Sequence, residues 1–191
     1  GDVQWMKTGR GIIHSEMPAM KEGKLLGFQL WINMPAKSKM NKPEYLYIKN
    51  DQLGVHKDNE KIIKVIAGKF ENAEGPEKGH NVDPIYFHIV LEKGKEFKCD
   101  VPSGHNSFIY LLTGDLSVGK NKHDKTNNSN LILLDRGDKL IVKANKKSEF
   151  LFIAGKPIGE PIARGGPFVM NTKAEILQAI QDYHNGTFAK Y

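Results

Sequence analysis

His14 and Glu16 are the two residues whose types and spacing could hold a metal ion. They stand two positions apart in the run GDVQWMKTGRGIIHSEM at the start of the sequence. On a β-strand, residues two apart point to the same face. An imidazole beside a carboxylate is half of a common ligand set for iron, manganese or zinc. Gly9 and Gly11 come just before the pair and predict a tight turn that leads into this strand.

The wider run GDVQWMKTGRGIIHSEMP closely resembles the pirin family, which belongs to the cupin superfamily. The resemblance covers nearly the whole chain and implies an all-β fold of two cupin domains in tandem. Each such domain is a jelly-roll barrel, or double-stranded β-helix, and here the first cupin is expected to be incomplete. Three further stretches carry the same resemblance: SFIYLLTGDLSVG (107–119), FLFIAGKPIGEPIARGGPFVMNT (150–172) and GPFVMNTKAEILQAIQDYHNGTF (166–188).

The pirin resemblance also implies a cofactor, because the first cupin of that family holds one iron through four side chains. Two are histidines of an H-P-H segment, and two are the histidine and glutamate of an H-[SA]-E segment. Only the second pair, His14 and Glu16, is present in this sequence. Three interpretations stay open: the chain is truncated and metal-free, the other ligands come from another chain or fragment, or water and a remote histidine complete a weak site.

A completed site of this kind suits Fe(II), with positions open for water, substrate or O₂. Beside it, Glu16 could either bind the metal or take the substrate's hydroxyl proton as a general base, so we predict it as the catalytic residue. Gln4, Trp5 and Met6 would shape an apolar pocket by family resemblance. Plain core packing is the alternative for Trp5 and Met6.

The second cupin is expected to be metal-free. Aligning its closing Gly114 with the first-cupin pattern puts Asp100, Pro102 and Asn106 at the ligand positions, and His105 falls one place off. His88 alternates with apolar residues on a predicted strand and is interpreted as a packed or hydrogen-bonded side chain. The remaining histidines lie in polar surroundings and are expected to be solvated: His56, His80, His123 and His184.

Short strand-like runs bounded by glycine, proline and asparagine dominate the chain, as in an all-β sandwich or barrel. We expect a strand from Phe28 to Ile32 with one face buried, and a last strand, SEFLFIAGKP, that closes the sheet. We also expect hairpins at Gly114-Asp115 and at 136–138. Further strands are predicted at 44–50, 61–70 and 84–94.

One helix is predicted near the C-terminus. Thr172 and Glu175 have the T-x-x-E spacing of a capping box, and Gly186 is a plausible stop. Apolar residues recur at helical spacing and should face the β-body: Ile176, Ala179, Ile180 and Tyr183. The predicted domains are the back part of the first cupin (1–70), a connector (71–83), the second cupin (84–165) and a tail with the helix (166–191).

Composition describes an ordinary globular protein, with 191 residues, 39% hydrophobic and 26% charged. No apolar run is long enough for a membrane span, and no signal-peptide pattern is visible. The single cysteine, Cys99, fits a reducing compartment, so we expect a cytoplasmic protein, or a nuclear one if it is eukaryotic. The net charge is +6, but the lysines are dispersed without interleaved aromatics, which argues against direct nucleic-acid binding.

Three functions remain open at this point. The first is a quercetin 2,3-dioxygenase-like oxidoreductase that acts on a flavonol-like small molecule. The second is a protein-binding transcriptional co-regulator, as some pirins are regarded. The third is a truncated, metal-free pirin-like protein.

Overall fold

A computed structural model describes residues 1–17, 22–23, 25–78, 81–119 and 130–189. Its contacts divide the chain into two compact units. Unit 1 contains Gly1–Trp5 and Tyr47–Pro157, and unit 2 contains Met6–Leu46 and Ile158–Tyr191. This division differs from the four domain ranges expected from the sequence. Those four ranges stay a prediction.

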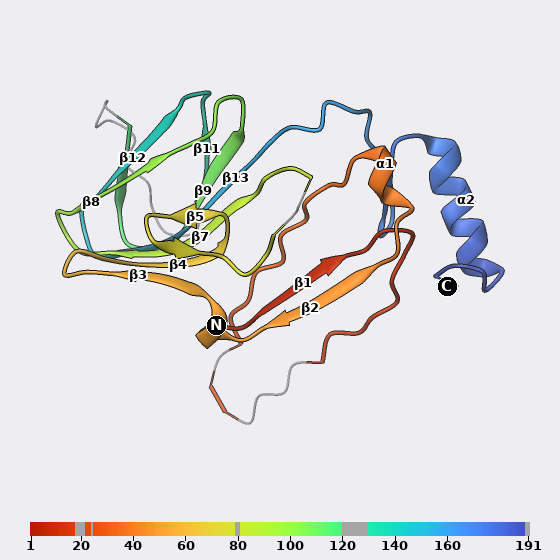
Figure 1. Cartoon of the computed structure of the whole chain (residues 1–191), viewed down its shortest axis with the longest axis horizontal. Coiled ribbons are helices and arrows are strands. Elements are labelled where there is room, and N and C mark those ends of the chain that lie inside the picture. The colour runs from red at the N-terminus through yellow and green to blue at the C-terminus, as the bar shows by residue number, and fades with distance from the viewer. Residues whose placement is uncertain (18–21, 24, 79–80, 120–129, 190–191) are drawn as a thin grey trace. The chain divides into compact units, whose positions relative to one another are not determined.

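Unit 1 is built around two antiparallel sheets (Figure 1). The larger sheet has the strand order β11-β9-β13-β7-β4-β3, and the smaller one has the order β10-β12-β8. The larger sheet consists of β3 (Gly54–Lys57), β4 (Lys61–Ala67), β7 (Ile85–Leu91), β9 (Asn106–Thr113), β11 (Leu131–Leu134) and β13 (Ser148–Gly155). The smaller sheet consists of β8 (Glu96–Asp100), β10 (Leu116–Val118) and β12 (Lys139–Ala144). The short strands β5 (Lys69–Phe70) and β6 (Ala73–Glu74) pair with each other, and η1 (Asn50–Gln52) is a 3₁₀ turn.

The core of unit 1 lies between these sheets, because alternate residues of each strand point inward. Phe87 and Phe152 from the larger sheet and Phe97 from the smaller one are fully buried. The ring centroids of Phe97 and Phe152 lie 6.4 Å apart, and those of Phe97 and Phe150 lie 6.1 Å apart. Aromatic contacts therefore join the two layers, in the manner of a cupin sandwich.

The expected strands at 44–50, 61–70 and 84–94 are present as β2 (Glu44–Ile48), β4 with β5, and β7. Both expected hairpins are wrong. β9 pairs with β11 and β13, whereas β10 pairs with β12, so the turn at Gly114-Asp115 carries the chain from one sheet to the other. The turn at 136–138 likewise joins strands of different sheets, because β11 belongs to the larger sheet and β12 to the smaller one. The strand β13, expected to close the sheet, lies inside it between β9 and β7.

Unit 2 contains a short helix α1 (Ala36–Lys39), the hairpin β14 (Ala163–Gly165) with β15 (Phe168–Met170), and α2 (Lys173–His184). Strand β1 (Val3–Lys7) pairs with β2, and the division between the two units falls within both of these strands. Within unit 2, the ammonium group of Lys39 is buried and donates to Asn33 Oδ1 at 2.7 Å and to the Val169 carbonyl at 3.2 Å. Burial lowers the pKa of Lys39, against the opposing attraction of Glu160 and Glu175. These bonds tie α1 to β15.

The predicted C-terminal helix is confirmed, with its capping box. The Thr172 hydroxyl oxygen accepts from the Glu175 amide at 3.2 Å, and the Thr172 amide donates to Glu175 Oε2 at 2.7 Å. The helix ends before Gly186, whose φ of +67° is left-handed. Ile176 is buried against Gly165, as expected of a residue facing the hairpin. Tyr183 is instead 55% exposed, so the inward-facing stripe is narrower than predicted.

Two predicted strands in unit 2 are absent. Residues 11–17, which carry His14 and Glu16, and residues 28–32 belong to no strand in the part of the chain that the structure describes. Phe28 is 45% exposed rather than half-buried in a sheet. A strand needs a hydrogen-bonded neighbour, and the sequence pattern alone cannot supply one.

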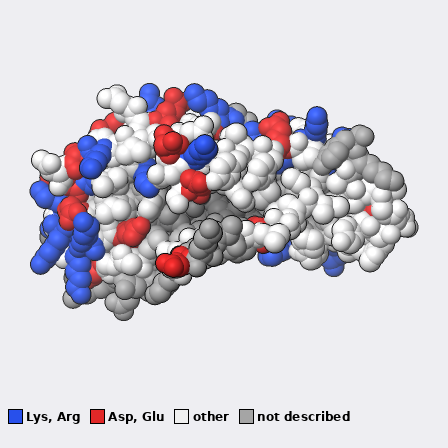
Figure 2. All heavy atoms as spheres, turned by 90° about the horizontal axis from the view of Figure 1, so that it is seen from below, with Lys and Arg blue, Asp and Glu red and all other residues white. Residues whose placement is uncertain are grey.

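In Figure 2, basic side chains gather at the left of the view with acidic side chains among them, and much of the right-hand part carries neither. Several lysines have acidic partners, such as Lys147 with Glu92 at 2.6 Å and Lys98 with Glu96 at 2.9 Å. Part of the positive charge is therefore balanced by neighbouring carboxylates. Among the described residues, no helix is both long enough and apolar enough to cross a membrane.

Candidate metal site

The predicted ligands His14 and Glu16 lie on an exposed segment without regular secondary structure, which follows a tight turn. The turn is as predicted: Gly9 has a φ of +48° and Gly11 a φ of +135°. A Cβ at Gly9 would lie 2.1 Å from the Asn41 carbonyl oxygen, and one at Gly11 would lie 2.3 Å from Phe188 Cζ. Both glycines are needed, because the chain bends in left-handed conformations against close neighbours.

Glu16 is held by a line of contacts within unit 2. The Gln29 amide donates from Nε2 to Glu16 Oε1 at 3.0 Å. The Trp31 indole donates from Nε1 to Gln29 Oε1 at 3.1 Å. The guanidinium carbon of Arg164, on β14, lies 5.4 Å from the centroid of the Trp31 ring, a cation–π contact. The carboxylate of Glu16 thus has a defined partner although it is exposed.

The donor types of this pair fit a divalent metal, since a neutral imidazole nitrogen and a carboxylate oxygen are common ligands of Fe(II), Mn(II) and Zn(II). Their number is smaller than a stable site needs, which is three or four protein ligands. Within the described ranges, no group of three or more His, Cys, Asp or Glu side chains could hold an ion. Completing a site requires water or groups beyond the described residues.

The ligand positions that alignment suggested in the second cupin, Asp100, Pro102 and Asn106, are all exposed in the structure. The Asp100 side chain is 89% exposed and lies 3.6 Å from the Lys139 ammonium. Asn106 is exposed at the start of β9. His105 is only 8% exposed, and its Nε2 donates to the Asp83 carbonyl at 3.2 Å. Its Nδ1 is buried without a hydrogen-bond partner among the residues that the structure describes.

The other histidines differ in their surroundings. His88 hydrogen-bonds through Nε2 to Glu149 Oε1 at 2.7 Å, which confirms the interpretation of a hydrogen-bonded side chain. His184 is exposed at the end of α2. His80 and His123 lie outside the described residues.

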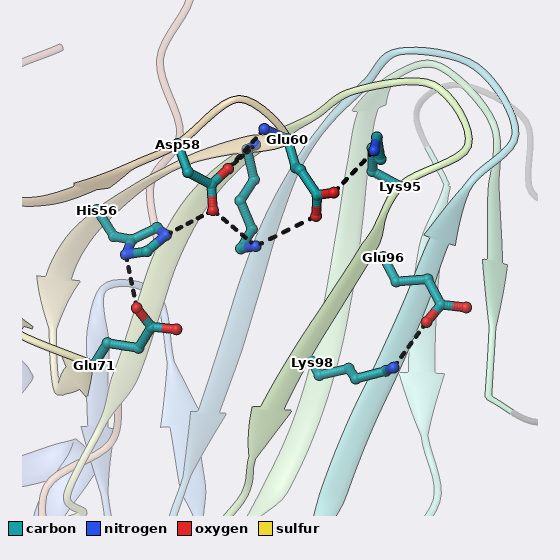
Figure 3. A network of polar contacts seen from close by, with 8 residues as sticks. His56, Asp58, Glu60, Glu71, Lys95, Glu96 and Lys98 are labelled. Atoms are coloured by element: carbon teal, nitrogen blue, oxygen red, sulfur yellow. Dashed lines mark hydrogen bonds and ion pairs between the residues drawn. The ribbon is translucent and has the colours of Figure 1, made fainter.

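The expectation of a solvated His56 is wrong, because its side chain is only 20% exposed (Figure 3). Its Nε2 lies 3.1 Å from Asp58 Oδ2 and its Nδ1 lies 3.0 Å from Glu71 Oε2. The Phe70 ring meets the imidazole edge-on at 5.3 Å.

Asp58 is the centre of this network. It accepts the backbone amides of Glu60 at 2.7 Å and Lys61 at 2.8 Å, closing the turn between β3 and β4. These amides, with His56 and the Lys61 ammonium, hold the pKa of the Asp58 carboxyl well below its ordinary value. The network stabilises a turn, because Asp58 accepts two backbone amides of that turn and both imidazole nitrogens of His56 face carboxylates (Figure 3).

Gln4, Trp5 and Met6 were predicted to shape an apolar pocket. Trp5 is buried, Met6 is half-buried and Gln4 is exposed. The burial of Trp5 agrees with core packing. Sequence reasoning missed Gln29, Trp31 and Arg164 as neighbours of Glu16. The two-residue spacing of Gln29 and Trp31 was the available signal, but it was interpreted as a strand face.

Two pirin family models match this chain. The one described as the pirin C-terminal cupin domain matches residues 86–189, and the one described as pirin matches residues 1–32. A pirin-like protein of Caulobacter vibrioides is 39% identical over 190 residues, covering 98% of this chain and 68% of the relative. The chain belongs to the pirin family of cupin proteins.

Two further comparisons agree with membership of the pirin family. A Vibrio cholerae protein, provisionally named quercetin 2,3-dioxygenase, is 37% identical over 196 residues, covering 100% of this chain and 68% of the relative. The crystal structure of quercetin 2,3-dioxygenase from Acinetobacter baumannii superposes with a TM-score of 0.82 at 29% identity. That match covers 98% of this chain and 67% of the other. The chain spans about two thirds of the length of these relatives.

Proposed function

We propose that this chain binds a divalent metal, Fe(II) by preference, through His14 and Glu16. The observation that carries the proposal is the hydrogen bond from Gln29 to Glu16, which gives a defined position to a carboxylate two residues from His14 on one exposed segment. The segment lies within residues 1–32, the range matched by the pirin family model. Water, or ligands from outside the described residues, would fill the remaining positions.

We further propose that the metal-loaded protein oxidises a flavonol-like small molecule, as a quercetin 2,3-dioxygenase does. Bound Fe(II) would supply a site for a catechol-like or flavonol oxygen beside O₂. In this chain, Glu16 would either bind the ion or accept the hydroxyl proton of the substrate. His14 would contribute a neutral nitrogen donor. A cytoplasmic location is part of the same proposal.

The second candidate is a metal-free protein that works through its surface, as a protein-binding co-regulator would. The observation that favours it is the incomplete ligand set, since the described residues contain no group of three metal-binding side chains. The two candidates differ in their response to metal, because a ligand that binds only the native state raises the melting temperature.

Metal binding is tested on the purified chain by elemental analysis beside its intact mass, then by anaerobic titration with Fe(II). We expect a metal-dependent rise in melting temperature that is lost in His14→Ala and Glu16→Ala. His184→Ala is the matched control, since it removes another exposed histidine from unit 2. If neither Fe(II) nor a chelator changes the melting temperature, metal binding is rejected and the metal-free candidate is favoured.

Oxygenase activity is tested by mixing the Fe(II)-loaded protein with quercetin anaerobically and then admitting O₂. We expect loss of flavonol absorbance and release of one carbon monoxide per flavonol consumed. The Glu16→Ala variant should lose both signals. Metal binding without turnover would reject the dioxygenase and keep the metal site.

A further inference from the structure

The contacts of Glu16 carry a second inference, which rests on the proposed metal site and adds to it. We propose that Gln29 is a positioning residue: it orients the Glu16 carboxylate for the metal and is itself oriented by Trp31. The Gln29 bond occupies Glu16 Oε1 and leaves the other carboxylate oxygen to bind a cation.

The orientation of the Gln29 amide follows from the chemistry of its two neighbours. An indole nitrogen can only donate a hydrogen bond, and an ionised carboxylate can only accept. The amide oxygen must therefore face Trp31 Nε1, at 3.1 Å, and the amide NH₂ must face Glu16, at 3.0 Å. The reverse orientation would break both bonds, so Trp31 selects the amide orientation that serves Glu16.

Trp31 is in turn held from another part of unit 2. The Arg164 guanidinium lies over its ring, 5.4 Å from the centroid, and Arg164 is paired with Val169 in the register of the hairpin of β14 and β15. The indole is 54% exposed, so without such a contact its rotamer would be free to change. The line Arg164–Trp31–Gln29–Glu16 thus connects a regular hairpin to a segment that has no strand hydrogen bonds of its own.

A glutamine suits this position better than a charged donor. Its neutral NH₂ orients the carboxylate and leaves the negative charge available to a cation, whereas a lysine or arginine would compete with the metal. Groups that hydrogen-bond to metal ligands commonly change metal affinity 10- to 100-fold when they are replaced. Gln29 would act in this way.

The test uses Co(II), whose visible absorption bands report ligand geometry, added to the full chain. We expect Gln29→Leu to weaken Co(II) binding about tenfold and to change the band positions. Trp31→Phe keeps an aromatic ring at this position but removes the indole donor, and should weaken binding less. Gln178→Leu is the matched control, because Gln178 donates to the Asp182 carboxylate at 2.9 Å on α2, away from these residues in the sequence. It should change neither quantity.

A metal-free measurement separates the two proposals. In the apo protein, Gln29→Leu should shift the Trp31 indole N–H resonance in the ¹H–¹⁵N spectrum, while Gln178→Leu should not. Co(II) binding that needs Glu16 but keeps its affinity and spectrum in Gln29→Leu would overturn the positioning role and leave the metal site standing. Failure of the wild-type chain to bind Co(II) or Fe(II) would overturn both proposals, even with the indole shift present.

Discussion

At the scale of single residues, Gly11 decides whether the segment of His14 and Glu16 can be held in place. Its φ is +135°, and a Cβ there would lie 2.3 Å from Phe188 Cζ. We predict that Gly11→Ala lowers the stability of unit 2 by about 2 kcal/mol or more, through backbone strain and overpacking. Thermal denaturation and Co(II) titration measure the effect.

Gly27→Ala is the matched control for Gly11→Ala. Gly27 belongs to the same unit, and a Cβ there would meet no atom within 4 Å. Its variant should melt close to the wild type. Equal melting temperatures and equal Co(II) affinities for the two variants would contradict the tight contact between Gly11 and Phe188.

Cys99 gives a second prediction at this scale. Burial, with a smaller contribution from Asp100, raises the pKa of its thiol to about 11 from an ordinary value of 9.0. The folded state therefore holds a proton that the unfolded state releases between these values, and the free energy of unfolding should fall as the pH rises above about 9. Cys99→Ala should remove this part of the pH dependence in chemical denaturation curves.

The reactivity of Cys99 tests the same burial. Alkylation at pH 8 should be slow in the native protein and fast in denaturant, since the thiolate is the reactive form. Rapid modification of the native protein would contradict the raised pKa.

Residue types and spacing identified His14 and Glu16, because an imidazole and a carboxylate two apart are visible in a string of letters. Whether they form a metal site remains a prediction. The partners Gln29 and Trp31 were out of reach, since a hydrogen bond between residues 13 apart depends on how the chain returns. His56 was misjudged partly for the same reason: Asp58 is two positions away, but Glu71, the other acidic side chain that covers it, lies 15 positions further along the chain.

At the scale of elements, the helix α2 was predictable because its signals are local. Its capping box can be tested: we predict that Thr172→Ala costs about 1 kcal/mol, since the hydroxyl oxygen accepts the Glu175 amide. Hydrogen exchange of the first-turn amides and far-UV circular dichroism measure the loss. Thr187→Ala is the control at the other end of the helix: its hydroxyl donates to the Asp182 carbonyl, so the first-turn amides should keep their protection.

The pH dependence of this cap has a defined sign. Hydrogen bonding by Thr172 lowers the pKa of Glu175 from its ordinary value of 4.5. A carboxylate whose pKa is lower in the folded than in the unfolded state stabilises the folded state. This contribution is complete above the unfolded-state pKa and is lost as the pH falls through the folded-state pKa. Protection of the α2 amides should therefore decrease below about pH 4.5 in the wild type and less so in Thr172→Ala. An equal decrease in amide protection in the wild type and in Thr172→Ala would show that the capping box is not its source.

Strand pairing was less predictable than strand existence. Period-2 alternation identifies which residues face inward, yet it does not say which strand lies beside which. The Gly-Asp dipeptide at 114–115 is typical of hairpins. Here the Asp115 amide donates to the Ser148 hydroxyl at 3.0 Å, and this bond holds a turn that passes between the two sheets. The turn is therefore anchored by a contact with β13, more than 30 residues away in the sequence, which the dipeptide alone does not reveal.

At the scale of the whole molecule, the hydrophobic core between the sheets and the candidate metal ligands belong to different units. Unit 1 has a closed aromatic core between its sheets, whereas His14 and Glu16 lie in unit 2 on a segment without strand pairing. The overall cupin class could be predicted because the pirin resemblance runs along nearly the whole chain. The division into these units could not, since it depends on contacts between segments far apart in the sequence.

This separation predicts where metal binding should be felt. With Co(II) in excess at about 100 times its dissociation constant, linkage stabilises the bound state by about 2.7 kcal/mol. Amides of residues 13–17 and 26–31 should exchange up to about 100-fold more slowly, while those of β7 and β13 in the core of unit 1 should be unchanged. Mass-spectrometric hydrogen exchange resolves these segments, with Glu16→Ala as the control. Bound Co(II) that protected β7 and β13 but left residues 13–17 unprotected would place the ion elsewhere and remove His14 and Glu16 from its ligand set.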